Sequence, residues 1–413
     1  MASSRTYFII TGTFLYITCT YLLYMKAIKY CILLVIISVC RVVSAQAQDS
    51  LRFSLLTCAP GEMVYELFGH TAIRYQNFTR YTDIVFNYGM FDFDTPNFAY
   101  RFAKGQADYQ LGVNSFDSFK RSYARRGSSV YEQELNLTAV EKQTLQRLLF
   151  DNFKPENRVY RYNYFFNNCT TCARDQIEKA IQGKVIYPEG EKRKSFRGIV
   201  HEYSVNCPWD QFGMDLLLGA EADEEINNRL QMFAPFYMRD FASKAYILSD
   251  DGSQRPLVSH EFKIVNLPPR VIEPGFILSP MACAIIFLFV NLCIAYLQIK
   301  KRRVYWGWDI ILYGAQGIAG CVIAFLFFFS THPTVGSNWM LALLHPLALF
   351  YIPWSLWRCK KGAKDHFSMI NLVYLTFFII SMPFIPQDFN LTILPLALGL
   401  LVNAASHVLA TRK

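Results

Sequence analysis

The chain has 413 residues, of which 53% are hydrophobic and 18% are charged, and its formal net charge is +9. This length allows two or three folding units, and the hydrophobic content indicates that part of the chain lies in lipid. The basic residues stand in short clusters at the ends of apolar segments, as in membrane proteins. No stretch combines a long basic face with interleaved aromatic residues, so we expect membrane association and no nucleic-acid binding.

Residues 1–47 are typical of an export signal. From Met25 the sequence has a charged start, an apolar run and a small-residue cleavage site, formed in turn by Lys26 and Lys29, by residues 31–40, and by Val43-Ser44-Ala45 or Ala45-Gln46-Ala47. Residues 1–24 are also apolar, and we expect the true start to be Met25, with a retained helix as the alternative. Both interpretations predict that the following segment is exported.

Residues 48–274 mix predicted strands and helices, which indicates an α+β domain long enough to have its own core. Thr71–Tyr75 and Asp83–Asn87 are short, aromatic and β-branched, as strands are. Thr138-Ala139-Val140-Glu141 is a capping box that predicts the start of a helix. Residues 169–182 carry apolar side chains at helical spacing and are followed by a glycine, which predicts a second helix.

From residue 275 to residue 413 apolar segments dominate the sequence. Five of them are long enough to cross a bilayer, namely Phe276–Gln298, Asp309–Ser330, Asn338–Trp357, Phe367–Pro386 and Leu391–Ala410. Basic clusters follow the first, third and fifth segments, whereas the other two connections carry no lysine or arginine; the clusters are Lys300–Arg303, Arg358–Lys361 and Arg412-Lys413. The positive-inside rule therefore predicts cytoplasmic basic loops and a large domain on the outer side of the membrane.

Histidine and cysteine are scarce in the exported domain, which contains only His70, His201, His260, Cys58, Cys169, Cys172 and Cys207. Cys169 opens a predicted helix, where the positive end of the helix dipole favours a thiolate. The alternatives are that Cys169 is a small buried apolar residue, or that it forms a redox pair or disulfide with Cys172 in a CxxC pattern. Cys58 and Cys207 are candidates for a structural disulfide.

His70 is the best candidate partner for Cys169. A histidine within hydrogen-bonding reach of a cysteine gives an ion pair, and the imidazolium later protonates the leaving group. A third polar group usually orients the imidazole. Asn87, on the next predicted strand, is our first choice for this group, and Glu62 and Glu66 are the alternatives.

A basic segment follows the second predicted helix and contains Lys192, Arg193, Lys194 and Arg197. Such a segment is most often a solvated loop, and this is what we expect here. Contact with lipid head groups is the functional alternative.

Four motifs taken together resemble the Lnb family of Bacteroidetes lipoprotein N-acyltransferases: Cys58-Ala59-Pro60-Gly61, Phe68–Arg74, Asn87–Phe93 and Asn167-Asn168-Cys169. The stretch Asp215–Gly219 and the five apolar segments fit the same family, so the resemblance covers nearly the whole mature chain. More distantly, the order of histidine first and cysteine later is similar to circularly permuted papain-like enzymes, including the NlpC and lecithin:retinol acyltransferase groups. The resemblance implies a permuted papain-like domain in the periplasm, followed by a bundle of about five transmembrane helices in the bacterial inner membrane.

The resemblance also implies that Cys169 is the nucleophile, His70 the base and Asn87 the third residue, with no metal or cofactor. The implied reaction moves an acyl chain from a membrane phospholipid, through a Cys169 thioester, to the α-amino group of diacylglyceryl-cysteine on a bacterial lipoprotein. A thioester must be kept from water, so we expect an apolar mouth lined by aromatic residues such as Phe165 and Phe166. The alternatives are an NlpC-like peptidase or amidase that acts on the cell wall, and a non-enzymatic envelope scaffold.

Overall fold

The structure, a computed structural model, describes residues 24–26, 28–35, 50–92, 94–188, 194–268, 276–360 and 366–411. The predicted cleavage site, Lys192, Arg193, Lys361, Arg412, Lys413 and the boundary at 274–275 lie outside the described residues. The chain divides into two compact units, Met1–Arg52 with Gln76–Thr82, and Phe53–Tyr75 with Asp83–Lys413. In the first unit, residues 24–26 and 28–35 are helical. The second unit contains all the candidate site residues.

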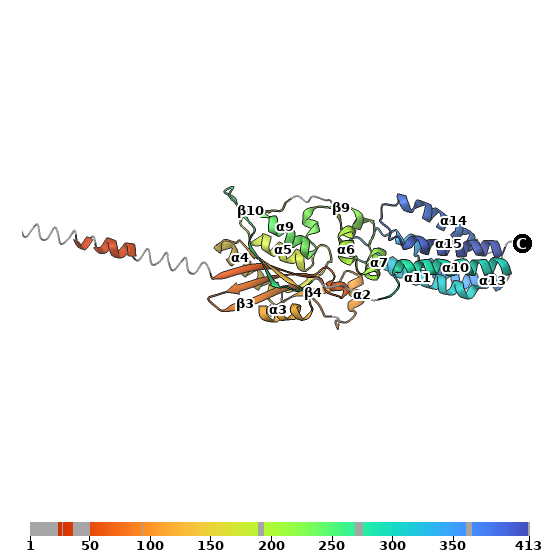
Figure 1. Ribbon diagram of the computed structural model, residues 1–413, viewed down its shortest axis with the longest axis horizontal. Helices are drawn as coiled ribbons and strands as arrows, with labels where there is room; N and C mark the ends of the chain where they lie inside the picture. Colours follow the sequence, from red (N-terminus) through yellow and green to blue (C-terminus); the bar gives the residue numbers. More distant parts are fainter. Residues whose placement is uncertain are drawn as a thin grey trace, which may run out of the picture. The chain divides into compact units, whose positions relative to one another are not determined.

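A seven-stranded sheet forms the centre of the exported domain (Figure 1). Its strands, in spatial order, are β12 (Val258–Val265), β5 (Val130–Leu135), β1 (Leu51–Cys58), β2 (His70–Asn77), β3 (Thr82–Met90), β4 (Asp108–Ser115) and β6 (Val159–Arg161). The pairs β12–β5, β5–β1, β3–β4 and β4–β6 are antiparallel. Six consecutive residues of β1, Phe53–Cys58, are buried, and since successive side chains point to opposite faces, the sheet is covered on both sides.

Helices on opposite faces of the sheet provide this cover (Figure 1). On one face, α3 (Phe116–Arg125) packs two phenylalanines against Ala72 of β2 and Val85 of β3. On the other face lie α4 (Ala139–Phe153), whose Phe150 contacts Tyr75 and Phe86, and α5 (Cys169–Ala180). The predicted capping box at Thr138 and Glu141 is confirmed at the start of α4, and the two predicted strands are confirmed as parts of β2 and β3.

Shorter elements complete the exported domain. The helices are η1 (Val64–Glu66), α2 (Phe98–Ala103), α6 (Phe196–Ser204), α7 (Pro208–Leu217), η2 (Ala220–Asp223), α8 (Asn228–Gln231) and α9 (Pro235–Lys244). The small strands are β7 (Lys184–Ile186), β8 (Lys194–Ser195), β9 (Glu225–Ile226), β10 (Tyr246–Leu248) and β11 (Gln254–Pro256). A second apolar cluster joins α6, the segment before α5 and the segment after α8, through residues such as Phe165, Phe196 and Phe233. The α+β class predicted from the sequence is confirmed.

Among the described residues, four helices are long and apolar enough to cross a membrane. They are α10 (Pro280–Lys301), α11 (Trp306–Phe329), α14 (His366–Ser381), which η3 (Met382–Phe384) extends, and α15 (Ile393–Ala410). The third expected span, 338–357, is broken instead into α12 (Met340–Leu343) and α13 (Leu347–Lys360). The expected apolar segment is therefore helical, but its helix is interrupted near its middle.

Pro346 explains the break. Proline has no N–H, and it disfavours helical conformation at the residue before it, His345. Neighbouring helices satisfy the carbonyls that the break leaves unpaired: Gln316 Nε2 donates to the Leu343 carbonyl at 2.8 Å. The Tyr374 hydroxyl donates to the carbonyl of Ala342 at 2.5 Å. In a low-dielectric membrane, irregular backbone needs such partners.

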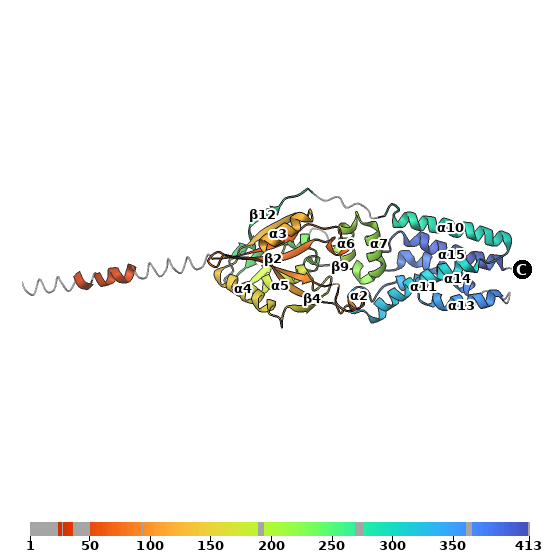
Figure 2. The same ribbon diagram turned by 90° about the horizontal axis from the view of Figure 1, so that it is seen from below.

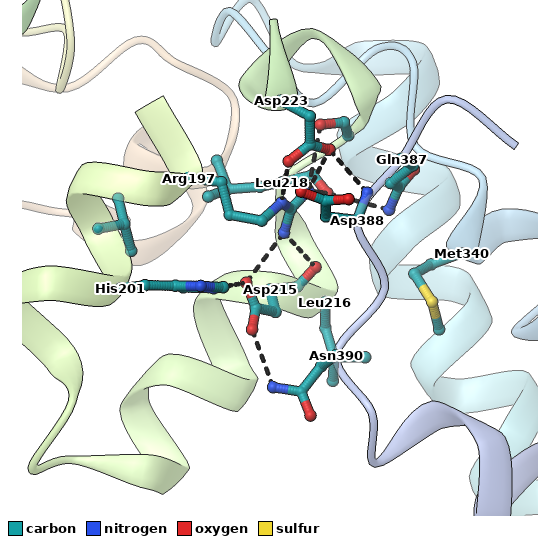
Figure 3. A network of polar contacts seen from close by, with 12 residues as sticks. Arg197, His201, Asp215, Leu216, Leu218, Asp223, Met340, Gln387, Asp388 and Asn390 are labelled. Atoms are coloured by element: carbon teal, nitrogen blue, oxygen red, sulfur yellow. Dashed lines mark hydrogen bonds and ion pairs between the residues drawn. The ribbon is translucent and has the colours of Figure 1, made fainter. Parts of the chain in front are cut away.

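Arg197 of α6 is buried, with 1% of its surface exposed, so the expectation of a solvated basic loop was wrong for this residue. Its guanidinium donates to Asp223 Oδ1 at 2.6 Å and to Asp215 Oδ1 at 3.0 Å (Figure 3). It also donates to the carbonyls of Leu218 and Gly219 at 2.9 and 3.2 Å. The segment Asp215–Gly219, quoted above only as part of the family resemblance, therefore supplies three of the residues that bind the buried arginine.

The same two carboxylates bond the connection between α14 and α15. Asn390 Nδ2 donates to Asp215 Oδ2 at 2.9 Å, and the Asp388 N–H donates to Asp223 Oδ2 at 3.1 Å (Figure 3). Burial raises the pKa of Asp215, but hydrogen bonds from His201 and Asn390 and the charge of His201 outweigh burial, so this pKa is lower than usual. Asp215 therefore stays ionised and links the exported domain to the membrane domain.

A second attachment joins α2 to the end of α11 (Figure 2). Ser330 Oγ donates to the Ala103 carbonyl at 2.7 Å, and the Thr331 N–H donates to the Lys104 carbonyl at 3.0 Å. The rings of Tyr100 and Phe325 lie 5.7 Å apart. These contacts at the end of α11 add to those that Asp215 and Asp223 make with the connection between α14 and α15.

Replacing Arg197 by leucine would leave the buried Asp215 and the partly buried Asp223 without their shared cation. We expect Arg197→Leu to lower the free energy of unfolding by about 3–5 kcal/mol, measured as a fall in Tm in detergent micelles. Lys194→Leu is the matched control, because Lys194 bonds Glu202 and Tyr237 near the surface and such pairs contribute at most about 1 kcal/mol. Equal losses in the two variants would contradict the buried position of Arg197.

Candidate functional site

Cys169 is the first residue of α5, and Asn168 holds it there. The Asn168 side-chain oxygen accepts the N–H groups of the second and third helical residues, both at 2.9 Å. Its Nδ2 donates to the carbonyls of Tyr164 and Phe233, also at 2.9 Å. The amide is buried and bonded at both ends, so the start of α5 is tied to two neighbouring segments. This positioning role of Asn168 was not predicted from the sequence, because the carbonyls that Asn168 bonds belong to segments that meet it only in the folded chain.

His70 is the first residue of β2 and follows a glycine that the turn requires. Gly69 has φ of +79°, and a Cβ there would lie 2.3 Å from the Cys58 carbonyl oxygen. Only glycine adopts this left-handed conformation without a clash. The turn brings His70 to Asn87 of β3, with 3.3 Å between His70 Nε2 and Asn87 Oδ1.

A β-bulge brings the backbone of β3 close to Cys169. The register between β3 and β4 shifts between Asn87 and Met90, and Gly89 in this stretch has φ of +87°. A Cβ on Gly89 would lie 3.5 Å from the Cys169 Cβ. Bulges of this kind redirect a strand locally and are common next to active sites.

The hydrogen bonds of Asn87 determine which nitrogen of His70 carries the proton. Asn87 Nδ2 donates to Asn114 Oδ1 at 3.1 Å and to the Val85 carbonyl at 3.3 Å. Its Oδ1 therefore faces the His70 ring as an acceptor, and His70 Nε2 is the donor. The other ring nitrogen, Nδ1, is then the one that can exchange a proton with the thiol.

The Cys169 thiol and the His70 imidazole line the same cavity and shift each other's pKa. Burial by itself raises the pKa of Cys169, but the charge of His70 and hydrogen bonds from His70, the Thr71 N–H and Thr170 lower this pKa below its usual value. Burial by itself lowers the pKa of His70, but the charge of Cys169 and hydrogen bonds to Cys169 and Asn87 raise it. Both shifts favour a thiolate–imidazolium pair, which is the reactive state of a cysteine nucleophile.

The pair opens into a cavity of about 410 Å³. Its walls are formed by the turn around Gly61, the ends of β2, β3 and β4, α3, and the segment before α5. Ser118, Ser122 and Arg126 line one side, whereas Phe91, Tyr109 and Tyr162 provide aromatic lining. The cavity thus offers both polar and apolar surface next to Cys169.

The predicted mouth residues do not line this cavity, and that prediction was wrong. Phe165 is 4% exposed and packs in the core against Phe196 and Phe233. Phe166 also contacts Phe196. The aromatic lining comes from β3, β4 and the Tyr162 region instead, because the chain turns between Tyr162 and Cys169 and directs the two phenylalanines away from the cavity.

The other predicted site residues have different surroundings. Glu66 lines the cavity but pairs with Arg126, with 2.9 Å between Oε1 and Nη1, and Glu62 is exposed.

The four thiols of the exported domain are free, and Cys58 and Cys207 belong to different core clusters. Cys172 Sγ donates to Asn167 Oδ1 at 3.2 Å, and burial raises the pKa of Cys172 to about 12, so this thiol stays protonated. The structure therefore brings together Cys169, His70 and Asn87, and it places Arg126, which the sequence analysis did not single out, in the same cavity.

Comparison with known protein families identifies both parts of the chain. Residues 43–190 match the family model of the Lnb N-terminal periplasmic domain, and residues 272–413 match that of the Lnb transmembrane domain. No curated protein and no solved structure matches the chain. The chain is therefore a membrane protein with a periplasmic domain, and the two matched regions agree with the two parts of the fold.

The pH dependence of Cys169 alkylation tests the ion pair. We expect iodoacetamide to modify Cys169 at pH values well below the usual thiol pKa, because His70 stabilises the thiolate. His70→Ala removes the largest effect that lowers the pKa of Cys169, so the alkylation profile should move to higher pH. Cys172 should react slowly throughout, and identical profiles in the wild-type chain and His70→Ala would contradict the pairing. The labelled residue is identified by peptide mass spectrometry.

Proposed function

Because this chain belongs to the Lnb family, we propose that it transfers an acyl chain from a membrane phospholipid to the α-amino group of diacylglyceryl-cysteine at the N-terminus of bacterial lipoproteins. The observation that carries the proposal is the Cys169–His70–Asn87 arrangement at a partly aromatic cavity. A cysteine paired with a histidine that a third group orients is a common design for acyl transfer through a thioester.

In the first half-reaction, the Cys169 thiolate attacks an ester carbonyl of the phospholipid. The new C–S bond forms as the ester C–O bond breaks, and the His70 imidazolium gives its proton to the departing oxygen, which releases lysophospholipid. Three N–H groups of the first turn of α5 already bond Asn168. We therefore assign the developing oxyanion to the N–H of Cys169 itself, next to the positive end of the helix dipole.

In the second half-reaction, the lipoprotein amine attacks the thioester. The amide C–N bond forms, the C–S bond breaks, and neutral His70 accepts the proton of the amine. This step restores the thiolate–imidazolium pair. The hydrogen bond from His70 Nε2 to Asn87 keeps the ring in one tautomer through both steps, so that Nδ1 alone exchanges protons.

The contacts between the exported domain and the membrane helices support this function over a cell-wall hydrolase. Both the donor and the acceptor are lipids that stay in the membrane, and the attachments through Arg197 and through α2 keep the cavity on a membrane-embedded support. An NlpC-like peptidase or amidase acting on soluble stem peptides needs no such support. The aromatic lining also suits a reaction in which water must not reach a thioester.

The proposal is tested with the purified full-length chain and phospholipid. We expect intact-mass analysis to show an acyl adduct on Cys169 that hydroxylamine removes, followed by N-acylation of a diacylglyceryl-cysteine peptide. Cys169→Ser should reduce acyl transfer by at least about a thousandfold, and His70→Ala by about 10²–10⁴-fold.

Cys172→Ser is the matched control, since Cys172 lies on the same helix but its thiol stays protonated, and this variant should keep its activity. Absence of the adduct in the wild-type chain under turnover conditions would reject the thioester route. Cleavage of stem peptides without acyl transfer would favour the hydrolase, and a chain inactive in both assays would favour the scaffold.

A further inference from the structure

Three polar side chains form a line along α3 on the side that faces the cavity. Ser118, Ser122 and Arg126 stand four residues apart, a spacing that places them on one face of a helix, and all three line the cavity with Cys169. Among the described residues that line the cavity, Arg126 is the one arginine or lysine. Its side chain is 47% exposed, so a ligand in the cavity can reach it.

A chain of aromatic rings leads from the cavity to the membrane domain. The rings of Tyr162 and Tyr109 stack at 4.0 Å, and Phe91 lies 4.9 Å from Tyr109. From Phe91 the series continues into α2, with Phe98 at 5.6 Å and Phe102 at 6.1 Å from Phe98. It ends where α2 contacts the end of α11, with Phe102 5.5 Å from the ring of His332 (Figure 2). Apolar surface therefore connects the membrane domain to Cys169.

The geometry points to a donor subsite in which Arg126, with Ser118 and Ser122, binds the phosphate of a glycerophospholipid while the acyl chain lies along the aromatic rings. This inference rests on the proposed function and specifies how its donor is bound. Arginine binds phosphate through two parallel hydrogen bonds, and serine hydroxyls supply further donors. A lipid held in this way at its phosphate and along its acyl chain has its ester carbonyl between the two, where Cys169 and His70 lie.

Glu66 gives the subsite a test of its own. In the structure its carboxylate pairs with Arg126, and a phosphate entering the cavity would compete with it. If Arg126 served only to hold the loop that carries Glu66, removing either partner would have the same effect. If Arg126 binds phosphate, neutralising Glu66 should improve phospholipid binding, whereas neutralising Arg126 should weaken it.

The acceptor substrate has no phosphate, so Arg126 is expected to act in the first half-reaction only. The experiment measures thioester formation on the full-length chain with three donors: a phospholipid, a diacylglycerol with the same acyl chains, and the p-nitrophenyl ester of the same acid. We expect Arg126→Gln to lower kcat/KM for the phospholipid by about 10–100-fold, as for the loss of a hydrogen-bonded charge, and to change the two phosphate-free reactions by less than about twofold. Aminolysis of a preformed thioester should proceed at the wild-type rate.

Three further measurements separate phosphate binding from a structural role. Arg126→Lys, which keeps the charge but not the paired hydrogen bonds, should be intermediate, and Glu66→Gln should lower KM for the phospholipid. Inorganic phosphate should inhibit the wild-type chain with the phospholipid donor more than it inhibits Arg126→Gln. The neighbouring Arg125 does not line the cavity, so Arg125→Gln should react like the wild type with every donor.

Equal losses with all three donors, or equal losses in Arg126→Gln and Glu66→Gln, would overturn the subsite and leave the proposed function standing. A wild-type chain that forms the thioester from the p-nitrophenyl ester but from no phospholipid would overturn the proposed function and the subsite together.

Discussion

The contact between Cys169 and His70 is the interaction on which the rest of the site depends. Each group alone would be neutral in this buried position, since burial opposes both a thiolate and an imidazolium. Placed together, they stabilise each other's charged form by more than burial costs. The contact requires glycines with positive φ at positions 69 and 89 and the buried helix cap Asn168. Together these residues bring the start of α5 close to β2 and β3.

Arg197 holds together the contacts that attach the exported domain to the membrane domain. A buried ion pair is rarely more stabilising than an apolar contact of the same size, but it demands a definite geometry of its partners. Here the partners are two carboxylates whose remaining oxygens bond the connection between α14 and α15. The arginine thereby restricts how α6 and α7 can lie on the membrane domain, and α2 adds a second restriction at the end of α11.

The cavity next to Cys169 is chemically two-sided, as a phospholipid is. The face of α3 supplies hydroxyl groups and one guanidinium, and the other side supplies stacked aromatic rings that continue toward the membrane helices. An amphipathic ligand can satisfy both surfaces in one orientation only. Orientation of this kind places the reacting atoms before the chemical step and lowers its entropic barrier.

Local signals in the sequence determined the capping box before α4, the strands that become β2 and β3 and the apolar segments, and they made Cys169 and His70 candidates, because each of these depends on neighbouring residues or on a short motif. Pro346 is also visible in the sequence, but the length and hydropathy of residues 338–357 favoured the prediction of one uninterrupted helix. The burial of Arg197, the entry of Arg126 into the cavity and the exclusion of Phe165 were decided by tertiary structure. Each depends on carboxylates, rings or turns contributed by distant parts of the chain, and the pattern of a single segment carries no information about which partners will fold against it.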